Sequence, residues 1–231
     1  MCLSCHFSFW NFIDDRSILA GMTTSTLKRR RGRPPKAPRA DHDTRAALIR
    51  SGTEVLTEQG FAASGIDGIL KRVGVPKGSF YYYFDSKEAF GQAVMAHYGA
   101  YFARKLDRHL LNDALSPLAR VEAFVDDAKG GMVRHDFRRG CLVGNLGQEV
   151  GSLPAAYRQW LRDTLANWQR RLARCLQEAQ EIGELARSAD VDRLAEAFWI
   201  GWEGAVMRAR LERSVRPMEV FLRCYLEGLP R

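Results

Sequence analysis

Hydrophobic residues recur at helical spacing from residue 43 to the end of the chain. The first stripe consists of Ala47, Leu48, Gly52, Val55 and Leu56. It predicts a helix that stops at Gly60. The second stripe consists of Ile66, Ile69, Leu70 and Val73, at positions i, i+3, i+4 and i+7. It predicts a short second helix. No stretch shows the alternation of a half-buried strand, so the pattern predicts an all-α fold.

Helix boundaries around these stripes predict a helix-turn-helix. Ser64 and Asp67 have the spacing of a capping box that begins the second helix. Gly74 ends that helix, and Pro76 is placed to open a third one, where a missing N–H costs nothing. A second cap, formed by Asp85 and Glu88, then begins a longer helix that runs to about Leu110.

The rest of the chain predicts a helical bundle. Ser116-Pro117, Pro154 and Asp190 mark helix starts, and glycines mark stops. The predicted helices span residues 117–134, 141–150, 154–181, 190–212 and 216–228.

Positive charge is concentrated before the first helix. The chain carries a net charge of +8, and residues 28–39 hold seven Lys or Arg and no acid. A run this dense favours contact with a polyanion, and nucleic acid is the first candidate. Within it, Arg31 and Arg33 flank a glycine and precede a proline, as in the core of an AT-hook that enters the minor groove. A solvated linker is the alternative.

The segment from Gly74 to Phe90 contains the most specific pattern. Phe80 and Phe84, four residues apart, supply a core face for a short helix. The side chains left for the groove are Lys77, Ser79, Tyr82 and Tyr83. Gly78 permits close backbone approach, and Lys87 is placed to grip a phosphate. The alternative is an aromatic core cluster, but three adjacent tyrosines cannot all point inward from one helix.

This segment resembles the signature of the TetR family of transcriptional regulators. The resemblance implies a three-helix DNA-binding domain, a homodimer that binds palindromic operator DNA, and release of the DNA by a small molecule. The candidate DNA-binding residues are Arg31, Arg33, Thr44, Lys77, Gly78, Ser79, Tyr81, Tyr82, Tyr83 and Lys87. The expected domains are a disordered basic arm (1–42), a helix-turn-helix domain (43–103, with the reading motif at about 66–85) and a ligand-sensing and dimerisation domain (104–231).

A narrower resemblance begins at Gly140-Cys141-Leu142 and continues through Asn145-Leu146 and Glu149-Val150. It looks like the branch of repressors that respond to acrylate and to N-ethylmaleimide, in which a cysteine after glycine senses electrophiles. Cys141 inherits that role as a hypothesis, with acrylate or another small electrophile as the inducer.

The local sequence is compatible with a reactive thiol at Cys141. Cys141 opens a predicted helix, and Arg138 and Arg139 add positive charge that would lower its pKa and attract a carboxylate. The alternative is a small buried apolar residue. Cys175 shares the apolar stripe of the helix at 154–181 and is expected to be a core residue.

Aromatic residues near the C-terminus suggest a pocket and a dimer interface. Trp199 and Trp202 are candidates to line a ligand pocket, although aromatic stripes are more often packing. The candidate interface residues are Trp199, Met218, Phe221 and Tyr225, on two helices that would form an intersubunit four-helix bundle.

Several other classes of function are disfavoured by the sequence. No apolar run reaches the length of a membrane span, so a cytoplasmic protein without membrane contact is expected. Cys2, Cys5 and His6 match a haem-attachment spacing without a signal peptide, and they lack a fourth ligand for zinc, so no cofactor or metal is expected. A helical enzyme with a reactive cysteine and an architectural DNA-binding protein remain as alternatives. The first lacks a His and carboxylate partner set, and the second needs no large bundle.

Overall fold

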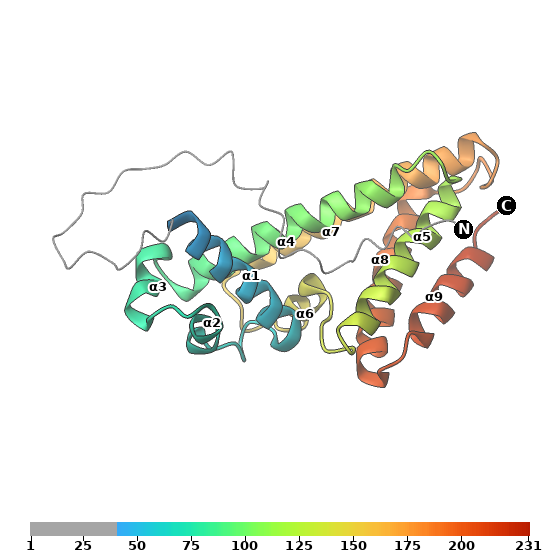
Figure 1. The fold of residues 1–231 in the computed structure, drawn as a ribbon. Helices are drawn as coiled ribbons and strands as arrows, with labels where there is room; N and C mark the ends of the chain where they lie inside the picture. The colour runs from blue at the N-terminus through green and yellow to red at the C-terminus, as the bar shows by residue number, and fades with distance from the viewer. Residues whose placement is uncertain (1–40) are drawn as a thin grey trace.

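The computed structural model describes residues 41–231, which form nine α-helices and no strand (Figure 1). The helices are α1 (Asp41–Gln59), α2 (Ile66–Val73), α3 (Lys77–Tyr83), α4 (Lys87–Leu110), α5 (Pro117–Arg134), α6 (Leu142–Gln148), α7 (Ala155–Glu181), α8 (Val191–Glu212) and α9 (Arg216–Glu227). The predicted all-α class is confirmed.

Helices α1 to α3 gather at one end of the molecule, where α1 packs against both α2 and α4. Two glycines make the turns between them. Gly60 after α1 has a φ of +80° and Gly74 after α2 has a φ of +71°, a region that side chains with a Cβ rarely adopt. The N–H of Gly74 also bonds a carbonyl of α2, as a left-handed helix cap does.

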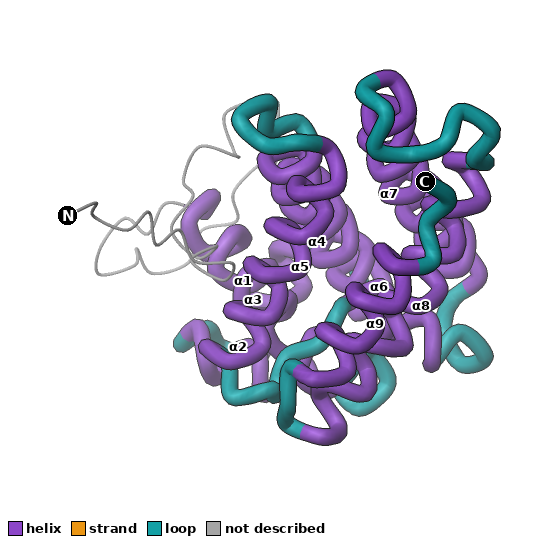
Figure 2. The backbone as a smooth tube through the Cα atoms, turned by 90° about the vertical axis from the view of Figure 1, so that its right-hand side faces the viewer, coloured by secondary structure: helices purple, strands orange, loops and turns teal. Residues whose placement is uncertain are grey.

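The long helices α4 and α7 run side by side from that end into the rest of the molecule (Figure 1). At the far end α7 packs against α8, and α8 against α9, while α5 covers α4 (Figure 2). Aromatic rings fill the space between these helices. The ring centroids of Phe102 and Trp168 are 4.2 Å apart, and those of Trp168 and Trp199 are 5.1 Å apart.

Two predicted helix caps are wrong by one residue. The N-cap of α2 is Gly65, because the hydroxyl of Ser64 bonds the carbonyl of Gly60 instead of capping the helix. The N-cap of α4 is Ser86, whose hydroxyl oxygen accepts a 3.0 Å hydrogen bond from the N–H of Ala89. Asp190 caps α8 through the N–H of Arg193, as predicted.

None of the helices in residues 41–231 has the length and apolar character of a membrane span. Within the same residues, no three His, Cys, Asp or Glu side chains are grouped to hold a metal ion. Cys2, Cys5, His6, Arg31 and Arg33 lie outside the described residues.

Candidate functional site

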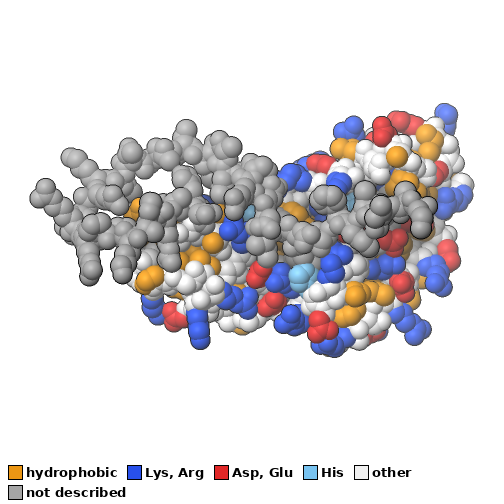
Figure 3. All heavy atoms as spheres, viewed as in Figure 1, with side chains coloured by type: hydrophobic (Ala, Val, Ile, Leu, Met, Phe, Trp, Pro, Cys, Tyr) orange, Lys and Arg blue, Asp and Glu red, His pale blue; other side chains and the backbone are white. Residues whose placement is uncertain are grey.

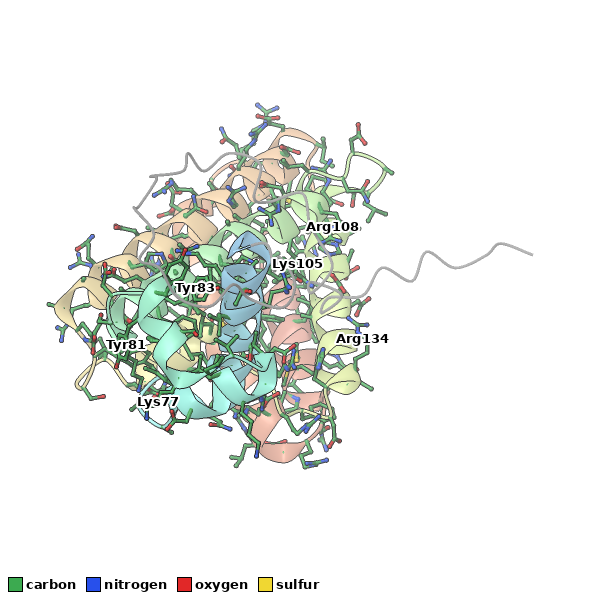
Figure 4. All side chains as sticks on the ribbon, turned by 60° about the vertical axis from the view of Figure 1, so that its left-hand side comes forward. Lys77, Tyr81, Tyr83, Lys105, Arg108 and Arg134 are labelled. Atoms are coloured by element: carbon green, nitrogen blue, oxygen red, sulfur yellow. The ribbon has the colours of Figure 1, made fainter. Side chains whose placement is uncertain are left out.

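Helix α3 presents polar groups on one face and buries aromatic rings on the other. Phe80 and Phe84 are buried, with ring centroids 5.5 Å apart. Tyr81 and Tyr82 expose 63% and 69% of their surface. Figure 4 shows Tyr81 and Lys77 at the outer edge of α3. The buried Phe80 and Phe84 and the exposed Tyr82 lie where the sequence predicts them, whereas Tyr83 packs partly against the core.

Exposed basic side chains lie on this helix and on the neighbouring α2, namely Lys77, Lys71 and Arg72. Lys77 is exposed and pairs with Asp67 of α2 at 3.1 Å, a contact in which both side chains remain largely in water. Lysine and arginine side chains also lie on the surface over α2 (Figure 3). An exposed pair of this kind contributes little to stability, so Lys77 is available for exchange with another anion.

The remaining predicted DNA contacts differ in exposure. Gly78 is exposed, whereas Thr44, Ser79 and Tyr83 are half-buried. The Lys87 ammonium donates a 3.0 Å hydrogen bond to the carbonyl of Phe61 and lies 4.6 Å from the centre of its ring. Lys87 therefore joins α4 to the turn after α1, a role that the sequence did not indicate.

Two adjoining cavities lie between α4, α5, α6, α8 and α9. The first has a volume of about 30 Å³ and is lined by Tyr98, Phe102, Phe124, Ala128, Met132, Gly140, Cys141, Trp202, Val206 and Met218. The second has a volume of about 60 Å³ and is lined by Gly140, Cys141, Gly144, Asn145, Gln148, Glu203, Val206, Met207 and Arg210. Cys141 belongs to both, so its thiol lies between an apolar chamber and a polar one.

The predicted electrostatics of Cys141 are wrong, although its place before α6 is right. Cys141 is the N-cap of α6 and is only 8% exposed. Burial raises the pKa of its thiol well above the usual value, and the nearby Glu203 raises this pKa further. Neither Arg138 nor Arg139 offsets these effects.

The two arginines before Cys141 face away from the cavities. Arg138 is exposed, and Arg139 forms ion pairs with Glu58 at 3.1 Å and Glu54 at 3.4 Å on α1. The positive group that lines the polar chamber is instead Arg210 of α8. Proximity along the sequence was misleading here, because the chain between α5 and α6 directs Arg139 toward α1 and leaves Arg138 exposed.

The sequence pattern did not indicate Glu203, which lines the polar chamber from α8. Its Oε1 is fully enclosed and has no hydrogen-bond partner. Burial raises the pKa of this carboxyl to about 7, far above the usual range of a glutamic acid. Its position four residues after the buried Trp199 was the available signal.

Two of the predicted interface residues are inside the protomer. Trp199 and Met218 are buried, and Met218 lines the apolar chamber. Phe221 and Tyr225 are half-buried against Phe198, with ring centroids 5.3 and 5.1 Å away. Trp199 and Met218 therefore cannot form a dimer surface, because neighbouring helices of the same chain already cover them. Trp202 lines the apolar chamber as predicted, whereas Trp199 lines neither chamber.

Helix α6 and its flanks form hydrogen bonds to the end of α1. The N–H of Gly140 and the side-chain amide of Asn145 both donate to the carbonyl of Thr57, at 3.0 and 2.9 Å. The Arg210 guanidinium donates to the carbonyl of Glu58. These donors satisfy carbonyls that the last turn of α1 leaves unpaired. We call this set of contacts the α1–α6 junction.

One carboxylate extends the α1–α6 junction past the end of α1. Glu149 Oε2 accepts hydrogen bonds from the N–H groups of Phe61 and Ala62, at 3.0 and 2.8 Å. The segment of residues 140–149 therefore both lines the polar chamber and holds the end of α1.

Two family models match the chain, one at each of the two ends of the molecule described above. Residues 48–94 match the model described as bacterial regulatory proteins, tetR family. Residues 117–225 match the model described as tetracyclin repressor-like, C-terminal domain. The chain belongs to the TetR family. It is thus a DNA-binding transcriptional regulator whose helix-turn-helix is formed by α2 and α3.

Individual relatives of this TetR-family chain agree with that assignment. It is 54% identical over 198 residues to the transcriptional regulator AcuR of Cereibacter sphaeroides, covering 86% of this chain and 90% of that one. It is similar to the crystal structure of a regulatory protein TetR from Rhodobacter sphaeroides, with a TM-score of 0.78, 52% identity, and coverage of 81% and 98%. The reduced form of Escherichia coli NemR gives a TM-score of 0.73, 30% identity, and the same coverage.

Proposed function

We propose that this TetR-family regulator is a dimeric repressor that binds palindromic operator DNA through α3 and releases it when a small electrophile reaches Cys141. The observation that carries the DNA-binding part is the two-sided character of α3. Buried Phe80 and Phe84 fix the helix, so exposed Lys77, Tyr81 and Tyr82 are held outward at a defined angle. The basic arm, with Arg31 and Arg33, would add phosphate or minor-groove contacts.

Replacing Lys77 or Tyr82 with alanine is expected to weaken operator binding by about 1–3 kcal/mol, because each removes a contact to a base or phosphate. Both side chains are exposed, so the fold should remain intact. Titration of a labelled operator fragment measures the affinity. Arg187→Ala, an exposed loop residue between α7 and α8, removes one charge elsewhere and serves as the control. Unchanged affinity in both variants would show that α3 does not contact the DNA.

The proposed dimer surface lies on α8 and α9. Ile200, Met207 and Leu211 follow one face of α8, and Ile200 and Leu211 are 70% and 77% exposed. Val220 of α9 is also exposed, and a groove between these helices adjoins it. A stripe of exposed apolar residues at helical spacing is a surface that a second copy would cover.

The dimer is expected to have twice the 26.1 kDa mass of the chain. Leu211→Glu should shift the mass toward that of one chain, because it places a charge in an apolar interface. Light scattering on a size-exclusion column measures both. A monomeric parent protein would contradict the proposal.

The α1–α6 junction supports the sensing part of the proposal. Cys141 follows Gly140, which bonds Thr57 of α1, and precedes Asn145, which bonds the same carbonyl. A ligand that displaces this segment must disturb the contacts that orient α1, and with it α2 and α3. The resemblance to the acrylate-responsive and N-ethylmaleimide-responsive branch supports a small electrophile as the inducer. An enzyme built on Cys141 is not favoured, since both family models describe transcriptional regulators.

A further inference from the structure

Cys141 and Glu203 both line the polar chamber. Oε1 of Glu203 is enclosed and makes no hydrogen bond. A Cβ added to Gly144 would lie 2.1 Å from Oε2 of Glu203 and 3.7 Å from the Cβ of Cys141. Only a glycine at 144 therefore leaves room for a carboxyl beside the thiol.

Three other polar groups complete the surroundings of this pair. The Cys141 thiol lies beside the Glu203 carboxyl, whose charge raises the pKa of the thiol, and the hydroxyl of Tyr98 on α4 donates a hydrogen bond to Sγ at 3.8 Å. Arg210, also on α8, lines the chamber, and its Nη1 lies 3.4 Å from Oδ1 of Asn145 on α6. The polar chamber thus combines a nucleophile, a carboxyl group and a cation, while Tyr98 reaches the thiol from the side of the apolar chamber.

The thiol needs a base, because its burial leaves almost no thiolate at neutral pH. Helix α6 cannot supply one, and Arg138 and Arg139 face away. The carboxyl of Glu203 is the group in contact with the thiol that can accept a proton.

We propose that Glu203 accepts the proton of Cys141 and so makes the thiol a nucleophile toward α,β-unsaturated carbonyl compounds. This inference rests on the proposed electrophile response. Sγ bonds the β-carbon as the C=C π bond opens, and the S–H proton passes to Glu203. The protonated carboxyl then returns that proton to the α-carbon, so the adduct contains every atom of thiol and ligand, and Glu203 ends unchanged.

The acid strength of the carboxyl suits this cycle. Burial raises the pKa of Glu203 to about 7. A carboxyl of this kind is half deprotonated near neutral pH, yet it is acidic enough, once protonated, to return the proton. Tyr98, Cys141 and Arg210 are the titratable or charged groups that face it, and burial raises the pKa of Tyr98 well above its usual value.

Acrylamide, a small neutral electrophile, tests the inference on the full chain. Its rate of addition to Cys141, followed by peptide mass, should rise through about pH 7 and level off in the parent. Glu203→Gln should slow the reaction at pH 7 by about 10²-fold or more and remove this inflection, because general bases contribute 10²–10⁴-fold. Glu203→Asp keeps a carboxyl and should keep the inflection.

Two controls separate the possible failures. Glu196→Gln, at an exposed position of α8, should react as the parent does, and exposed Cys224 should react equally in every variant. Equal rates and pH profiles for Glu203→Gln and the parent would overturn the role of Glu203 while the electrophile response stands. A parent whose Cys141 takes no adduct would overturn both.

Discussion

A saturating small electrophile is expected to reduce operator occupancy from about 99% to about 1%, and Cys141→Ser is expected to abolish this response. Such a change requires the ligand to favour the released conformation by about 10⁴-fold, or about 5.5 kcal/mol. A ligand that merely sits beside Cys141 does not supply this difference. An adduct that displaces residues 140–149 does, since the same segment holds the end of α1.

Operator titration with and without acrylate or N-ethylmaleimide measures the change in operator affinity. The mass of the peptide that contains Cys141 shows whether the electrophile binds covalently or reversibly. Covalent capture leaves a stable mass increase at Cys141, whereas reversible binding is undone by dialysis. Cys175→Ser is the matched control, because Cys175 is buried in the core and lines neither chamber. Unchanged operator affinity at saturating electrophile, with Cys141 unmodified, would contradict the sensing proposal and leave the DNA-binding assignment intact.

Replacing Asp127 with alanine is expected to lower the free energy of unfolding by about 3–5 kcal/mol, as breaking a buried ion pair does. Lys105 is fully buried, and its Nζ lies 2.6 Å from Oδ2 of Asp127. The same oxygen is 2.9 Å from Nε2 of His109. Without Asp127, the ammonium of Lys105 loses its counter-charge between α4 and α5 (Figure 4).

Urea denaturation of the parent, Asp127→Ala and the double variant Lys105→Met/Asp127→Ala measures this effect. The double variant should recover much of the loss, because it removes the buried charge along with its partner. A loss below about 1 kcal/mol in Asp127→Ala would show that the pair is not the main stabilising contact between α4 and α5.

The free energy of unfolding of the parent protein should also depend on pH through Lys105 and Asp127. Burial lowers the pKa of Lys105 to about 7 in the folded protein, while the unfolded chain keeps its proton until near the usual value of 10.5. The unfolded state therefore binds more protons between these values, and this group makes the folded protein more stable as pH rises through that window. Asp127 acts at lower pH. Burial alone would raise the pKa of Asp127, but His109 and Lys105 lower this pKa to about 2. The free energy of unfolding therefore decreases as pH falls from about 4 to 2.

The sequence predicted local features well where one helix determines them. The spacing of Phe80 and Phe84 was enough to divide α3 into a buried and an exposed face. The acidity of Cys141 was predicted wrongly. Burial by the surrounding helices raises the pKa of the thiol most, Glu203 raises it further from 62 positions away on α8, and the turn before α6 directs Arg139 toward α1. Likewise, the stripe that contains Trp199 indicates that it is covered, but not whether the covering helix belongs to the same chain.

The hydrogen bonds from residues 140–149 to α1 also limit how this regulator can be recombined with others. The C-terminal half of the chain completes the backbone bonding of the N-terminal half, through Asn145 at the carbonyl of Thr57 and Glu149 at the N–H groups of Phe61 and Ala62. A hybrid repressor that joins the helix-turn-helix end of this chain to the ligand-binding domain of another regulator would leave those groups unpaired. Such a hybrid must therefore include residues 140–149 together with the helix-turn-helix end. Otherwise equivalent hydrogen-bond donors and a carboxylate must be introduced into the other regulator's domain.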